Sequence, residues 1–186
     1  IFFDVNNNNN FSIFSLYIIF IGSSLYFLIG LHDDIFRSSP FLRLSFQFAI
    51  ALAVSNYGIN FGSLDFFVPY NGDINIIIPP FIDNILTSFW IVGITNAINW
   101  IDGMDGILCL FTTVVSIAFL KSNFLTGSFI ESSLLISLLG CSLGFLYQNI
   151  RVKKMFMGDS GSYFFGFMLS TTSILSTSNM IELNGK

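Results

Sequence analysis

Three short stretches of the sequence place carboxylates, amides and glycines beside strongly apolar segments. They read GLHDDIFRSSPFLRL (30–44), NAINWIDGMDG (96–106) and RVKKMFMGDSGSYFFG (151–166). Carboxylate and amide oxygens bind hard cations such as Mg²⁺, and a carboxylate can also act as a general base. Together with the basic residues near them, these groups predict metal-assisted phosphoryl transfer.

The first stretch contains two adjacent carboxylates, Asp33 and Asp34. Neighbouring acids repel each other, so the pKa of one of them rises unless a cation lies close, and such a pair suits a general base or a metal site. Taken alone, the pair has a simpler interpretation, a solvated helix end with Arg37 and Arg43 as membrane-interface anchors. His32 is expected to be a polar cap rather than a metal ligand.

In the second stretch an amide or a carboxylate recurs at every third position, at Asn96, Asn99, Asp102 and Asp105. On a helix this spacing gives a slowly drifting stripe, so the two asparagines can face one pocket. Gly103 and Gly106 let the chain unwind and bring the two aspartates toward it. Mg²⁺ is commonly held by one or two such groups, with phosphates and water completing its shell. The alternative is a polar helix cap at the membrane interface.

The third stretch places Asp159 and a Ser-Gly-Ser triplet at the start of the last apolar segment, after the basic run RVKK. This position predicts a helix N-terminus, whose N–H groups bind phosphate well, and Asp159 could hold the metal that bridges to that phosphate. Taken alone, the stretch could also be a loop or an ordinary helix cap.

The elements that must position these groups are membrane helices. Of the 186 residues 53% are hydrophobic and 10% charged, and the mean hydropathy is +0.76, whereas soluble domains carry about 25% charged residues. Several charge-free windows approach the roughly 20 residues that a spanning helix needs. We expect an all-α bundle of about six spans in one domain, at approximately 11–31, 42–58, 81–100, 106–121, 131–148 and 160–180. The third and fourth windows are the shortest.

A turn signal lies between the second and third expected spans, in LDFFVPYNGDINIII (64–78). Two strand-like runs flank Asn71-Gly72, which is a strong hairpin signal. We therefore expect a small extracytoplasmic β-hairpin. An irregular loop is the alternative, because Pro69 interrupts the first run.

The number of spans also sets the orientation. Successive spans alternate in direction, so the connections near 32–43, 99–106 and 149–159 share one membrane face. Five of the seven cationic residues fall on that face, namely Arg37, Arg43, Arg151, Lys153 and Lys154. Positive residues favour the cytoplasmic side. The topology therefore gathers the aspartates of all three stretches at the cytoplasmic surface.

Charge and residue usage exclude two other classes of function. The net charge of −4 and a pI near 4.6 argue against a nucleic-acid partner, which requires clustered Lys and Arg. Nucleophilic triads are excluded because the chain has one His, and neither Cys109 nor Cys141 lies near the cytoplasmic face.

The combination of motifs resembles the polyprenyl-phosphate N-acetylhexosamine-1-phosphate transferases, grouped as glycosyltransferase family 4. GLHDD looks like the family's Asp-Asp motif, NAINWIDGMDG like its Asn-Asp motif and FMGDSGS like its third motif, over about residues 20–175. The resemblance implies a bacterial plasma-membrane enzyme with a cytoplasmic active site. Such an enzyme would move N-acetylhexosamine-1-phosphate from a UDP-sugar to polyprenyl (undecaprenyl) phosphate and release UMP, as the initiating step of envelope polysaccharide or peptidoglycan synthesis.

The resemblance also implies the cofactor and the catalytic residues. The cofactor would be Mg²⁺, with Mn²⁺ as an alternative ion, and the assembly could include a homodimer. Asp33 and Asp34 would include the base that deprotonates the lipid phosphate. Asp159 would ligate the metal together with Asn99 or Asp102, and Asp102 is also counted among the catalytic residues.

Substrate contacts follow from the same matching of motif positions. Arg43 would meet a phosphate, and Asn96 would face the pocket that it shares with Asn99. The expected uridine contacts are Asp105, Asn149 and Phe156.

The chain departs from the family's pattern in two places. It lacks the family's N-terminal cytoplasmic motif rich in Pro and Arg, and it lacks the C-terminal cytoplasmic loop whose histidines bind the donor. We therefore expect an internal fragment of a longer transferase. The alternatives are a non-catalytic truncated remnant of the family and a small membrane transporter with an acidic lining. The small cytoplasmic loops slightly favour a simple UDP-N-acetylhexosamine donor.

Overall fold

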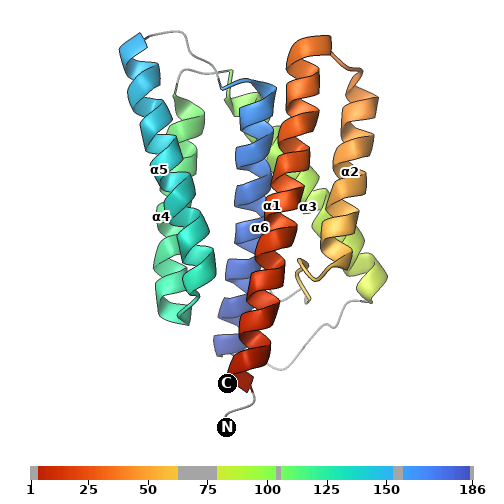
Figure 1. Ribbon diagram of the computed structural model, residues 1–186, viewed down its shortest axis with the longest axis vertical. Coiled ribbons are helices and arrows are strands. Elements are labelled where there is room, and N and C mark those ends of the chain that lie inside the picture. The colour runs from red at the N-terminus through yellow and green to blue at the C-terminus, as the bar shows by residue number, and fades with distance from the viewer. Residues whose placement is uncertain (1–3, 63–78, 104–105, 153–156, 185–186) are drawn as a thin grey trace.

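The computed structural model describes residues 4–62, 79–103, 106–152 and 157–184, and within these ranges every regular element is an α-helix (Figure 1). The helices are α1 (Asp4–Phe36), α2 (Pro40–Asn56), α3 (Pro80–Ile101), α4 (Ile107–Thr126), α5 (Phe129–Val152) and α6 (Gly158–Asn184). The expected all-α bundle is confirmed. The expected β-hairpin at 64–78 lies outside the described residues and stays a prediction.

Local sequence explains where several helices begin and end. Pro40 opens α2, because proline suits the first helical turn, where its missing N–H is not needed. The Ser39 hydroxyl caps the same helix by accepting from the Leu42 N–H at 3.4 Å. Gly106 and Gly127 flank α4 with φ of 70° and 72°. Glycine adopts this left-handed conformation without the steric penalty of a Cβ atom.

Four helical segments are long and apolar enough to cross a membrane: Phe14–Phe36, Pro80–Ile101, Ile107–Thr126 and Phe129–Asn149. They support an integral membrane protein. The third and fourth expected spans, which looked shortest in the sequence, are both among these four segments. Their helices, α3 and α4, extend a few residues past the charge-free windows, and α4 includes Lys121. Two expected spans do not qualify: α2 has 17 residues, and α6 is rich in Ser and Thr.

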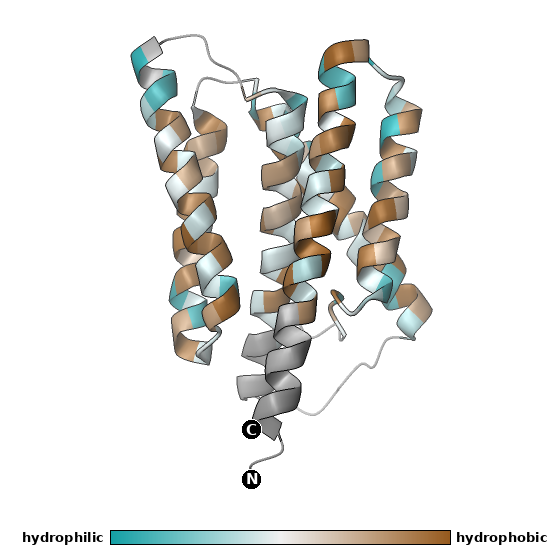
Figure 2. Ribbon diagram, in the orientation of Figure 1, coloured by the Kyte–Doolittle hydropathy of each residue, from teal (hydrophilic) through white to brown (hydrophobic). Residues whose placement is uncertain are grey.

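Helix α6 carries many Ser and Thr side chains and is buried inside the bundle. It packs against α1, α3 and α4, while α4 pairs with α5 and α2 packs on α3 (Figure 1). Its hydroxyls donate to carbonyls of the preceding turn, as Thr171 does to Phe167 at 2.9 Å and Thr172 to Met168 at 2.7 Å. Figure 2 shows its mixed, paler hydropathy beside the more apolar outer helices.

Glycine allows α1 to approach the start of α6 closely. A Cβ atom on Gly30 would lie 2.3 Å from the carbonyl oxygen of Asp159, which is backbone and cannot move aside. This contact sets the end of α1 directly against the third acidic stretch. The ends of α1, α3 and α5 lie at the same end of the bundle (Figure 1), as the alternation of spans predicted.

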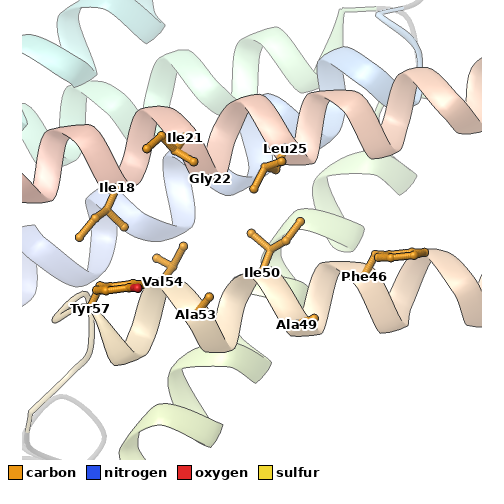
Figure 3. A pocket seen from close by; sticks show the side chains of 10 residues that line it. All are labelled: Ile18, Ile21, Gly22, Leu25, Phe46, Ala49, Ile50, Ala53, Val54 and Tyr57. Atoms are coloured by element: carbon orange, nitrogen blue, oxygen red, sulfur yellow. The ribbon is translucent and has the colours of Figure 1, made fainter.

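An apolar pocket of about 310 Å³ lies between α1 and α2. Figure 3 shows Ile18 and Leu25 of α1 facing Ile50 and Val54 of α2. No carboxylate, amide or basic group lines it, so this pocket is not the place where the acidic stretches meet.

Candidate active site

Arg43 joins the first and third acidic stretches. Its Nη1 donates to Asp33 and, at 3.1 Å, to Asp159 Oδ2. Three helices therefore meet at one guanidinium, because Asp33 ends α1, Arg43 begins α2 and Asp159 begins α6. The side chains of Arg43 and Asp159 keep 26% and 27% of their surface exposed, so a substrate can reach them.

Asn99 adds the second stretch to this cluster. Its Nδ2 donates to Asp159 Oδ1 at 2.7 Å and to Ser162 Oγ at 2.8 Å. Both N–H bonds of the amide are thus used, and its oxygen is the atom that can still bind a ligand. The aspartate of α6 is held by an arginine on one oxygen and an amide on the other.

Asp34 and Asp102 occupy the N-terminus of α6. Asp34 Oδ1 accepts from the Asp159 N–H at 2.9 Å, and Asp34 Oδ2 accepts from the Ser160 N–H at 3.0 Å. Asp102 Oδ2 accepts from the Gly158 N–H at 3.0 Å. Carboxylates at this end also complement the helix dipole. The sequence suggested that these N–H groups bind phosphate, but two side chains of the chain itself already accept from them.

Burial changes the acidity of Asp102, which follows α3. Loss of solvent is the largest effect and raises the pKa of this carboxyl, and the nearby charge of Asp34 raises it further. The Gly158 N–H opposes this by bonding the charged form. The two carboxylates at the start of α6 therefore influence each other, as expected for acids in one cluster.

Asn96 faces a different neighbour from Asn99. Its Nδ2 donates to Gln47 Oε1 at 2.7 Å, so it links α3 to α2 one turn below the aspartates. Sequence reasoning missed Gln47, although a signal was present: it is the single amide in the apolar run LRLSFQFAIALAV, four residues after Arg43 and hence on the same helix face.

The expected uridine contacts are only partly placed. Asn149 is buried near the start of α4, where its Oδ1 would lie 3.6 Å from a Cβ atom on Gly106. Asp105 and Phe156 lie outside the described residues. The structure therefore joins Asp33 and Asp159 through Arg43, with Asn99 bonded to Asp159 and with Asp34 and Asp102 at the N-terminus of α6. The nucleotide contacts stay predictions.

Within the described ranges, no three His, Cys, Asp or Glu side chains group closely enough to hold a metal ion. Asp33 and Asp159 face each other across Arg43, which neutralises part of their charge. What the arrangement offers is two carboxylates, one amide oxygen and one cation at a single solvent-accessible point.

Comparison with protein families matches residues 16–177 to glycosyl transferase family 4. The chain belongs to this family. The match spans all three acidic stretches and so agrees with the resemblance stated from the motifs.

Individual members of family 4 are similar to this chain. A Bacillus subtilis (strain 168) protein named "Probable undecaprenyl-phosphate N-acetylglucosaminyl 1-phosphate transferase" is 33% identical over 168 residues, 88% of this chain and 44% of that protein. The decaprenyl-phosphate N-acetylglucosaminephosphotransferase of Mycolicibacterium smegmatis is 30% identical over 82% of this chain and 39% of its own length. The phospho-N-acetylmuramoyl-pentapeptide-transferase of Streptococcus thermophilus (strain CNRZ 1066) is 40% identical over 46% of this chain and 25% of its own. The chain thus spans less than half the length of these relatives.

Proposed function

We propose that this chain forms the catalytic part of an enzyme that transfers N-acetylhexosamine-1-phosphate from a UDP-sugar to polyprenyl phosphate and releases UMP. The observation that supports it is the single cluster in which Arg43 and Asn99 hold Asp159 opposite Asp33. The relatives' names supply the substrate class, because they specify undecaprenyl or decaprenyl phosphate and an N-acetylglucosaminyl phosphate group.

Arg43 is the group that would bind the acceptor's phosphate. Both of its ion pairs with described residues use Nη1, and a guanidinium has five N–H donors in all. The remaining donors are available for an anionic oxygen. A phosphate held there lies next to Asp33, which can accept its proton as the phosphate attacks the donor.

The donor set fits Mg²⁺. Asp159, Asp33 and the Asn99 oxygen are hard oxygen ligands, and Mg²⁺ commonly takes one or two protein carboxylates with phosphates and water as its other ligands. When bound, the ion would neutralise the diphosphate and stabilise the leaving UMP. Asp159 and Asn99 would hold it, since Asn99 already fixes the orientation of that carboxylate.

Asp34 and Asp102 have a different part in this proposal. Their oxygens accept from three backbone N–H groups of α6, so they position the helix end that carries Asp159. Asp33 is then the better candidate for the base of the adjacent pair.

The position of the acids within the bundle favours this enzyme over a transporter. Transport acids lie near the bilayer midplane, often at broken helices, whereas these lie at helix ends on one side of the bundle (Figure 1). In this proposal the site lies at the cytoplasmic face of the plasma membrane, and the cationic residues on the same side support that orientation. The lipid acceptor can then approach sideways from the bilayer.

The test is an assay of the full-length protein in membranes with radiolabelled UDP-N-acetylhexosamines, polyprenyl phosphate and Mg²⁺. We expect labelled lipid and UMP in equal amounts, loss of both with a chelator and their return with Mg²⁺. Formation of free sugar phosphate without labelled lipid, or no product from any UDP-sugar, would contradict the proposed function.

A further inference from the structure

Gln47 is a contact point for several helices that carry the site. It is fully buried in α2. Its backbone carbonyl accepts from the Tyr26 hydroxyl of α1 at 2.8 Å, and its Oε1 accepts from Asn96 Nδ2 of α3 at 2.7 Å. The amide is therefore fixed in one orientation, with Nε2 turned away from Asn96.

The other side of this amide faces α6. Gln47 follows Arg43 by four residues, and Tyr163 follows Asp159 by four residues, so each pair lies on one helix face. Because Arg43 bonds Asp159, the second members of the two pairs meet one turn deeper. Tyr163 lies beside both Gln47 and Arg43 and is 1% exposed.

The Gln47 amide has a donor that makes no close hydrogen bond. Gln47 Nε2 is buried and makes no close hydrogen bond within the described part of the chain, and the Tyr163 hydroxyl is the polar group that lies beside it. An unpaired buried donor is costly, and in native proteins it usually indicates a water, an ion or a ligand-dependent contact. Here that donor belongs to a residue one helical turn after Arg43, which holds two carboxylates.

We propose that Gln47 and Tyr163 form a donor pair for the phosphate of the lipid acceptor, beneath Arg43. Gln47, oriented by Asn96, presents Nε2 to the phenol oxygen and thereby directs the phenol hydrogen toward a phosphate oxygen. Gln47 is then a positioning residue and Tyr163 a binding residue. This inference rests on the proposed function and adds two groups that bind the acceptor substrate.

The test uses Tyr163→Phe, Gln47→Glu and the double variant in the full-length protein, with kcat and KM measured for each substrate. Tyr163→Phe removes one hydroxyl and keeps the ring. Gln47→Glu keeps the oxygen that Asn96 bonds but replaces the donor by an acceptor. We expect each to raise KM for polyprenyl phosphate roughly 10- to 100-fold, as loss of a hydrogen bond to a charged group does, with KM for the UDP-sugar unchanged.

The double variant tests whether the two residues act as one unit. We expect its KM to match the larger single effect, because both changes remove the same directed hydrogen bond. Ser55→Ala is the matched control. It deletes a different hydrogen bond between α2 and α3, from Ser55 to Asn84 at 2.7 Å, and should lower thermal stability without changing either KM.

An unchanged KM for polyprenyl phosphate in Tyr163→Phe would overturn the inference. A KM in the double variant equal to the product of the two single effects would also overturn it, as would a rise only in KM for the UDP-sugar. Tyr163→Phe alone decides the matter if Gln47→Glu fails to fold. A wild-type protein without transferase activity would instead refute the proposed function. The two failures are therefore distinguishable.

Discussion

At the scale of single residues, the site depends on one cation between two acids. Asp33 and Asp159 are 126 positions apart in the sequence, and Arg43 bonds both of them. Without a cation the two carboxylates would repel each other and any phosphate that approached. Arg43 therefore offsets the repulsion between Asp33 and Asp159, and in the proposed function its remaining donors bind the acceptor phosphate.

Arg43→Lys tests this role because it keeps the charge but loses the planar guanidinium, which can bond several oxygens at once. We expect kcat/KM for polyprenyl phosphate to fall roughly 10- to 100-fold. Arg37→Lys is the matched control, since Arg37 is exposed and lies in the connection just before α2. Equal activity of Arg43→Lys and wild type would show that Arg43 does not bind the acceptor.

At the scale of the elements, the N-terminus of α6 is fixed by side chains from α1 and from the end of α3. Asp34 and Asp102 bond the N–H groups of Gly158, Asp159 and Ser160, and Gly30 allows the close approach. These contacts aim Asp159 at Arg43. They also explain why a helix rich in Ser and Thr begins where it does.

Two substitutions of Asp34 test whether it positions α6 or accepts a proton. Asp34→Asn keeps an acceptor oxygen, and Asp34→Ala keeps none, so a positioning role predicts that Asn retains much more activity than Ala. Asp34→Ala should also lower the free energy of unfolding by about 0.5–2 kcal/mol, as loss of a helix cap does. Thermal unfolding and turnover of both variants provide the measurement. Equal, near-complete loss of turnover in both, with unchanged stability, would identify Asp34 as the base.

At the scale of the whole molecule, much of the arrangement could be predicted from the sequence. Alternating spans placed the three acidic stretches at one end, and the structure agrees. The partners within the site could not be predicted, because they depend on how helices distant in sequence pack. Examples are the two caps of α6 and the Gln47–Asn96 pair. The charge-free window also predicted a span at 160–180, but it gave no sign that the hydroxyls of α6 bond within a helix buried in the bundle.

The central claim is that Asp159 belongs to a single site that transfers a phosphosugar. The most direct measurement is labelled-lipid formation by Asp159→Asn in the full-length protein, beside Asp83→Asn. Asp83 is the control carboxylate, since it is buried at the opposite end of α3, away from the site, and accepts from the Gly62 N–H at 3.0 Å. We predict that Asp159→Asn lowers turnover at least about 100-fold while Asp83→Asn turns over normally. Normal turnover by Asp159→Asn, or an equal loss in both, would contradict the account.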